Sequence, residues 1–145
     1  MRMQKQKNKR PQFDGMSSPV MVCVPKRVAQ AAQLALNLKA IGFCGATETG
    51  WKRAHQLSKE TTISIQDVRF IRNWYARHVF ASYPGYKTWA DQGKSTSLKW
   101  WNKHAIVSWL TWGGDAGLRW INSKRMLKLL NNYFSTTYST IFNNT

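Results

Sequence analysis

The chain has 145 residues, 43% of them hydrophobic and 13% aromatic, and its 22 Lys and Arg against 6 Asp and Glu give a formal charge of +16. This length and composition predict one globular domain and exclude a disordered chain. Two cysteines, Cys23 and Cys44, exclude a disulfide framework, and no apolar run approaches the length of about 18 residues that a membrane-spanning helix needs. The charge favours a polyanionic partner such as nucleic acid, an acidic protein surface or anionic lipid.

Residues 1–18 are predicted to form a flexible basic arm, because the segment is polar and contains Pro11 and Gly15. Cations on such an arm can each neutralise a phosphate without fixed geometry, which gives an affinity that depends on salt and not on sequence. The cations of the arm are Arg2, Lys5, Lys7, Lys9 and Arg10.

Residues 19–134 are predicted to form a helical domain that begins with an extended segment. The stretch "SPVMVCVP" is β-prone and bounded by Pro19 and Pro25, which favours a segment laid against another part of the protein. Apolar residues at steps of three and four predict a helix over 26–41 that Gly42 ends, and a shorter helix follows over 49–59.

The third predicted helix covers 63–80, "ISIQDVRFIRNWYARHVF". Ser64 followed by Asp67 is a capping-box pattern, and Ile63 and Val68 flank it as a hydrophobic staple. Helical spacing gathers an apolar face and leaves Arg69, Asn73 and Arg77 on the other side. The apolar face is predicted to contain Phe70, Ile71, Trp74, Tyr75 and His78.

Residues 81–97, "ASYPGYKTWADQGKSTS", are predicted to form a packed loop, because Pro and Gly interrupt them. A fourth helix over 100–112 ends at Gly113-Gly114, Asp115 caps a fifth, and Ser123 begins a sixth. Residues 135–145 lose the helical period and are predicted to be an extended tail. The expected fold is therefore an all-α, single-domain bundle of about five or six helices with extended arms at both ends.

The stretch "WLTWGGDAGLRW" is predicted to be a structural corner between two helices. A dinucleotide-binding loop would need G-x-G-x-x-G after a strand, and the nearby "QGKST" has Thr88 where a phosphate-binding loop needs its first glycine. Glycines can instead end one helix in the left-handed conformation while tryptophans close over the turn. The corner consists of Trp109, Trp112, Gly113, Gly114, Asp115 and Trp120.

Three elements together resemble an uncharacterised domain of tailed phages and large DNA viruses. They are "GATETGWKRAHQL", "RNWYARH" and "IVSWLTWGGDAGLRW", and they cover about half of the chain. The second glycine of the first element is Gly50, one position later than in the family pattern. The resemblance implies a viral origin and a virion component, and it implies no particular chemistry. The matching positions are Gly45, Arg53, Ala54, Leu57, Arg77, His78 and Trp109 to Gly117.

The sequence gives little support for catalysis, so we expect no enzyme. The six acids do not pair at helical spacing, and the histidines and cysteines lack the close spacing of a metal site. No cofactor or metal is expected. One catalytic alternative stays open, a phosphodiester site that uses Arg77 and His78. Another alternative is that the Trp-rich basic segment 99–112 lies at a membrane interface.

Polyanion binding has more support, because cations also cluster within the helical domain. Arg69 and Arg77, with Arg72 at the flank, are predicted to form a basic stripe on the third helix. Lys124, Arg125 and Lys128 lie at the start of the last helix, where the helix dipole disfavours cations. A helix start with added cations is suited to bind an anion.

Two functions follow as hypotheses. The first is a non-enzymatic structural protein of a DNA virus, a minor capsid or virion component whose arms and basic surfaces bridge neighbouring virion proteins. The second is a DNA-binding protein that condenses or processes the viral genome without sequence preference. Both place the protein in the virion and, during assembly, inside the infected cell.

Overall fold

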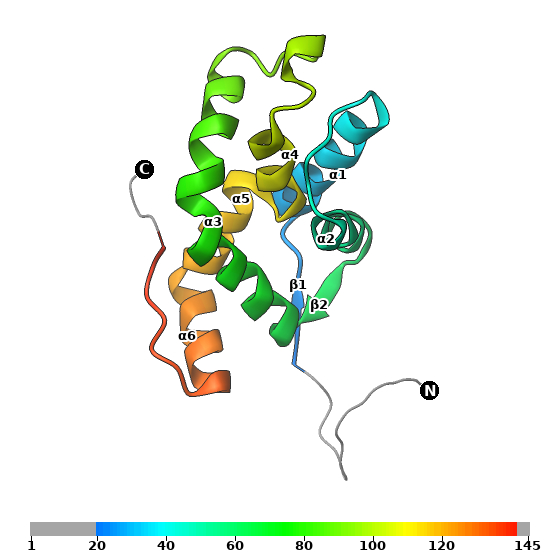
Figure 1. Ribbon diagram of the computed structural model, residues 1–145. Helices are drawn as coiled ribbons and strands as arrows, with labels where there is room; N and C mark the ends of the chain where they lie inside the picture. The colour runs from blue at the N-terminus through cyan, green and yellow to red at the C-terminus, as the bar shows by residue number, and fades with distance from the viewer. Residues whose placement is uncertain (1–19, 142–145) are drawn as a thin grey trace.

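The computed structural model describes residues 20–141, and the predicted arm over 1–18 with its five cations lies outside them. Six α-helices and one antiparallel pair of short strands make up the described part, which confirms the expected small helical fold (Figure 1). The elements are β1 Met21–Cys23, α1 Lys26–Ala40, α2 Glu48–Lys59, β2 Thr62–Ser64, α3 Ile65–Asp91, the 3-10 turn η1 Leu98–Trp100, α4 His104–Thr111, α5 Gly114–Asn122 and α6 Lys124–Phe134.

The short helix α4 lies at the centre of the fold and packs against α1, α2, α3 and α5. Its residues Ile106, Val107 and Trp109 are fully buried, because four helices pack around it. Figure 1 shows the long helix α3 along one side of this centre, with α6 and the C-terminal segment beyond it.

The predicted extended segment is confirmed as β1, which pairs with β2 in the register Met21↔Ser64. The predicted cap of α3 is also confirmed. The Ser64 hydroxyl accepts a hydrogen bond from the Asp67 amide at 3.1 Å and donates one to the Asp67 carboxylate. Because β2 directly precedes α3, the strand pair holds the start of α3 next to β1.

The predicted loop over 81–97 is wrong for its first half, because α3 continues through Pro84 and Gly85 to Asp91. The helical spacing of buried residues continues with Val79, Ser82, Tyr86 and Trp89, so burial of this face outweighs the cost of the proline. Gly85 has a packing role here, because a Cβ at this position would lie 2.7 Å from the Cβ of Ala105 on α4. On the same helix, the predicted apolar face is wrong at Phe70, which is 48% exposed.

The tryptophan–glycine corner forms as predicted, with one correction. Gly113 and Gly114 both have positive φ, of 117° and 62°, and they join α4 to α5. Gly113, and not Asp115, is the N-cap of α5, so Asp115 lies in the first turn of the helix. Its carboxylate instead accepts a hydrogen bond from Nε1 of the fully buried Trp109 at 2.8 Å. Of the other corner tryptophans, Trp112 is buried and Trp120 is half-buried.

Tyr75 ties α3 to this corner from inside the core. Its buried hydroxyl lies 2.6 Å from the Gly114 carbonyl oxygen and 3.2 Å from that of Trp112. Burial, helped by the charge of Asp115, raises the pKa of Tyr75 well above its usual value, so the phenol remains a neutral donor. Gly117 makes this approach possible, because a Cβ there would lie 2.3 Å from the Tyr75 hydroxyl oxygen.

The C-terminal segment is extended as predicted over its described part, and it is docked. The side-chain amide of Asn131 bonds both the N–H and the carbonyl of Tyr138, at 2.7 and 3.0 Å. Asn122 bonds Ile141 in the same way, at 2.7 and 2.6 Å. The predicted break between α5 and α6 is confirmed, since the Ser123 hydroxyl accepts from the Met126 amide.

The close approach of Gly117 and Tyr75 leads to a first prediction. Gly117→Ala should lower the free energy of unfolding by about 1–3 kcal/mol, because the added methyl group overpacks the corner. In a Tyr75→Phe background the same substitution should cost less, since the hydroxyl that it meets is gone. Urea denaturation of the four proteins of this cycle measures the coupling. Purely additive losses would contradict the close approach of the two residues.

Candidate polyanion-binding surface

The structure divides the predicted basic stripe on α3. The Arg69 Nε donates to the Tyr138 hydroxyl at 2.9 Å, and its guanidinium lies 4.3 Å from the centre of the Phe134 ring. Arg72 lies over the Tyr138 ring at 3.8 Å, and burial lowers the pKa of its guanidinium. Both arginines are half-buried and hold the C-terminal segment, whereas Arg77 is exposed. The three residues therefore do not form one open surface.

The predicted cations of α6 are exposed. Lys124, Arg125 and Lys128 all lie on the solvent side of the helix, near its Ser123 cap. Arg125 also lines a depression of about 590 Å³ together with Trp120 and residues of β1. The α6 cations thus lie beside the tryptophan that follows the corner.

Sequence reasoning missed a second group of cations that the fold brings to the same tryptophan. Lys26 and Arg27, from the first turn of α1, and Arg119, from α5, line a depression of about 340 Å³ whose wall includes Trp120. A sequence signal for the first two was present, because the first turn of α1 contains no acid and opens with two cations at an unfavourable dipole position. Arg119 could not be added to them from sequence, since nothing local predicts how α5 packs on α1.

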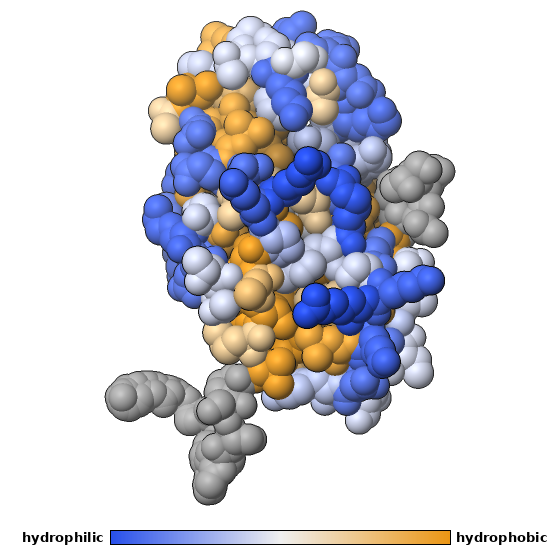
Figure 2. All heavy atoms as spheres, turned by 180° about the vertical axis from the view of Figure 1, so that it is seen from behind, coloured by the Kyte–Doolittle hydropathy of each residue, from blue (hydrophilic) through white to orange (hydrophobic). Residues whose placement is uncertain are grey.

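Three depressions join into one surface, which we call the basic groove. The depression at Lys26 shares Pro25, Trp120 and Ser123 with the one at Arg125, and it shares Arg27 and Ala116 with a third that Lys94 lines. Figure 2 shows strongly hydrophilic side chains lying across an apolar surface near the start of the described chain. The cations of the basic groove are Lys26, Arg27, Lys94, Arg119 and Arg125.

Little negative charge opposes these cations. Among the residues that line the three depressions, Asp115 is the one acid, and it is half-buried and bonded to Trp109. Five cations facing one engaged carboxylate create a positive potential along the groove. The arrangement can bind a chain of phosphates by charge, and the Trp120 ring adds an apolar face beside it.

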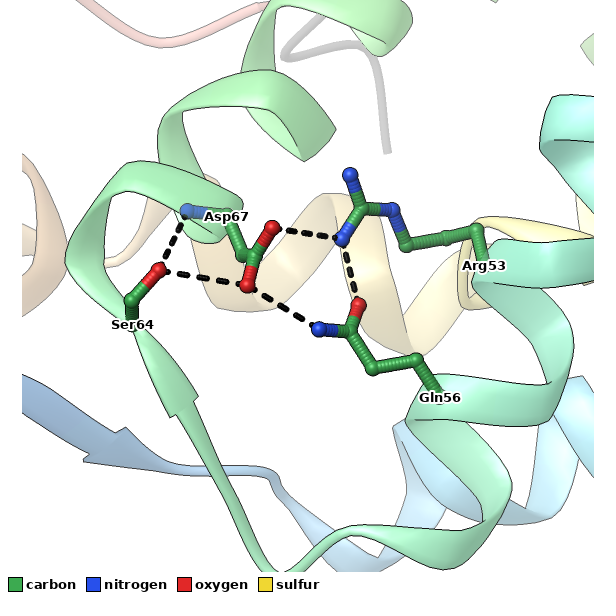
Figure 3. A network of polar contacts seen from close by, with 4 residues as sticks. All are labelled: Arg53, Gln56, Ser64 and Asp67. Atoms are coloured by element: carbon green, nitrogen blue, oxygen red, sulfur yellow. Dashed lines mark hydrogen bonds and ion pairs between the residues drawn. The ribbon is translucent and has the colours of Figure 1, made fainter. Parts of the chain in front are cut away.

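The three elements of the sequence resemblance meet elsewhere, around a stack of rings. The Arg53 guanidinium lies 5.2 Å from the Trp112 ring centre, Trp112 stacks on Trp74 at 5.3 Å, and the His78 ring lies 5.1 Å from that of Trp74. Figure 3 shows how Arg53 is held, with Asp67 and Gln56 as its hydrogen-bond partners. Gln56 also donates to Asp67 at 3.0 Å, so the start of α3 and the middle of α2 share one polar network.

Comparison of the chain with protein-family models, curated proteins and solved structures gives no match, so it neither supports nor contradicts the viral resemblance. Within residues 20–141, no helix is long and apolar enough to cross a membrane. The same residues contain no group of three His, Cys, Asp or Glu side chains that could hold a metal ion.

The Arg53 network leads to a second prediction. Arg53→Ala should lower the free energy of unfolding by about 1–3 kcal/mol, because it removes charge-assisted hydrogen bonds to a partly buried carboxylate. The Arg53 side chain is 11% exposed and that of Asp67 is 29% exposed. Lys52→Ala is the matched control, since Lys52 pairs with Glu48 in solvent and should contribute little. If Arg53→Ala and Lys52→Ala lower the free energy of unfolding equally, the network has no structural role.

Proposed function

We propose that the protein is a non-enzymatic DNA-binding protein that holds the phosphate backbone in the basic groove without sequence preference. The observation that carries this proposal is the alignment of five cations along the basic groove. Four of them, from α1, α5 and α6, line the two depressions that contain Trp120, and Lys94, from the segment after α3, lines the adjoining one. The formal charge of +16 supports it, because the field of the whole molecule attracts a polyanion.

The way in which the groove is built supports binding to phosphates and not to base edges. Its cations come from separate elements, and Gln30 is the one amide side chain among the residues that line the three depressions. Reading of adenine edges relies on such amides, so a single one gives little preference for adenine. The affinity should therefore arise from release of counterions, with the log of the binding constant falling by about 0.9 per log unit of salt for each phosphate bound.

A third prediction tests the groove directly. Arg27→Ala/Arg119→Ala should weaken binding to random-sequence duplex DNA and reduce the salt slope by about one for each phosphate that the protein no longer neutralises. Lys52→Ala/Lys59→Ala is the control, because it removes the same charge from exposed positions of α2, outside the groove. Fluorescence anisotropy at several salt concentrations measures both quantities. If the two variants bind alike, net charge and not the groove holds the DNA.

A second proposed function is a virion component that bridges neighbouring proteins, and the free side of β1 favours it. The sheet has two strands, so no second strand pairs with β1 among the described residues. The depression along it is lined by Val22, Met126 and Leu129, and by Met21, which is 52% exposed. An extended segment of a partner can add to such an edge and place apolar side chains in the depression. The viral setting of this role rests on the sequence resemblance.

A fourth prediction tests this bridging role. Met21→Lys, which places a cation in the part of the basic groove that runs along β1, should abolish incorporation of the protein into particles and slightly raise its DNA affinity. Quantitative mass spectrometry of purified particles measures the incorporation. Lys128→Met is the control, because it also changes the surface charge by one, at an exposed position of α6. Normal incorporation of the Met21→Lys protein would contradict a bridging role for this edge.

A further inference from the structure

A cleft of about 340 Å³ opens between the start of α2, the middle of α3 and α4. Its polar lining comes from all three helices and from the residue before α2, and none of these residues lines the basic groove. The polar side chains that the argument uses are Thr47, Thr49, Arg77, His78, Ser82 and Ser108.

The wall of the cleft is held in place before any ligand arrives. Trp74 and Trp112 line it, and their rings stack within 10° of parallel. The Arg53 guanidinium lies over the Trp112 ring at 5.2 Å. Arg53 is itself bonded to Asp67 and Gln56 (Figure 3). On the α2 side, Gly50 packs so closely that a Cβ would lie 3.2 Å from the Thr111 hydroxyl oxygen. A preorganised wall reduces the ordering cost of binding.

One buried residue in the cleft has a hydroxyl without a partner. Ser82 is 8% exposed and lines the cleft, and within residues 20–141 its hydroxyl has no hydrogen-bond partner. Its neighbours differ, since the Thr111 hydroxyl donates to the Ser108 carbonyl and the Thr47 hydroxyl oxygen accepts from the Gly50 amide. The Ser82 hydroxyl, and the hydroxyl proton of Thr47, are therefore free to donate into the cleft. Both hydroxyls can therefore reach a ligand in the cleft that accepts hydrogen bonds.

The charge of the cleft is positive. Arg77 is the one charged side chain among its described lining residues, and no carboxylate lines it. Burial, with a smaller effect from Arg77, lowers the pKa of His78, so the imidazole is neutral at neutral pH and can donate or accept. The lining thus combines an arginine fork, several hydroxyl donors and a neutral imidazole, which together match the oxygens of a phosphate group.

We infer that this cleft binds a phosphate monoester, with the Arg77 guanidinium on the phosphate oxygens and the Thr47 and Ser82 hydroxyls as further donors. The cleft is larger than a phosphate group alone, so it has room for part of the attached sugar or base. Two sources share this chemistry, a free nucleotide and the 5′ end of a nucleic-acid strand. The site goes beyond the basic groove, which holds phosphates along a backbone.

The first experiment uses the full chain and titrates adenosine 5′-monophosphate, adenosine and inorganic phosphate by calorimetry. The monophosphate should bind saturably and adenosine should not. Arg77→Gln should lower the affinity for the monophosphate by about tenfold or more, because it removes the charge-assisted contacts. Ser82→Ala should lower this affinity by less. Lys52→Gln is the matched control, a charge loss on exposed α2 outside the cleft. Equal binding of adenosine, or an unchanged affinity in the Arg77→Gln protein, would overturn the inference.

A second experiment identifies the source of the phosphate and separates the cleft from the groove. Oligonucleotides with a 5′-phosphate and with a 5′-hydroxyl are compared at a salt concentration at which groove binding is weak. If the strand with the 5′-phosphate binds more tightly, the ligand of the cleft is the end of a nucleic-acid strand. If the two strands bind equally while the monophosphate binds tightly, the ligand is a free nucleotide. The Arg27→Ala/Arg119→Ala protein should bind the monophosphate normally even though its DNA affinity is reduced. Weakening of both would overturn the cleft as a separate site.

Discussion

The hydrogen bond from Tyr75 to the turn between α4 and α5 is the contact on which the rest of the structure depends. It joins the middle of α3 to Gly114 inside a dry core, where the phenol stays neutral and an unpaired carbonyl would be costly. Gly113 and Gly114 supply the backbone angles of the turn, and Gly117 supplies the space for the phenol. This contact holds the turn before α5 against α3, and α5 places Arg119 and Trp120 beside the cations of α1.

The positive charge is effective because most acids of the chain pair with a cation or a hydrogen-bond donor of the chain itself. Asp67 binds Arg53, Asp91 binds Lys87, Glu48 lies near Lys52, and Asp115 accepts from Trp109. Some arginines are likewise structural, since Arg69 and Arg72 hold the C-terminal segment. What remains on the surface is an excess of unopposed lysine and arginine, and the fold concentrates part of it along one groove. The protein therefore separates charges that are paired within the fold from charges that lie open on the surface.

Sequence patterns predicted the parts of the fold that depend on local chemistry. Ser64 and Ser123 are caps, the glycine pair forms the turn, and β1 is extended, because neighbouring residues alone determine these features. The second half of α3 was missed, since Pro84 and Gly85 indicate a loop and only the burial of Tyr86 and Trp89 against distant helices overrides them. The basic groove was missed for the same reason. Its cations are far apart in the sequence, and their proximity is a property of helix packing.

The central claim is that DNA lies in the basic groove beside Trp120, and not against the tryptophans of the core. The indole N–H signals of the tryptophans in a two-dimensional NMR spectrum test it most directly. On addition of duplex DNA, the signal of half-buried Trp120 should shift, whereas that of Trp109, buried and bonded to Asp115, should stay in place. A shift of Trp109 without one of Trp120 would contradict the account.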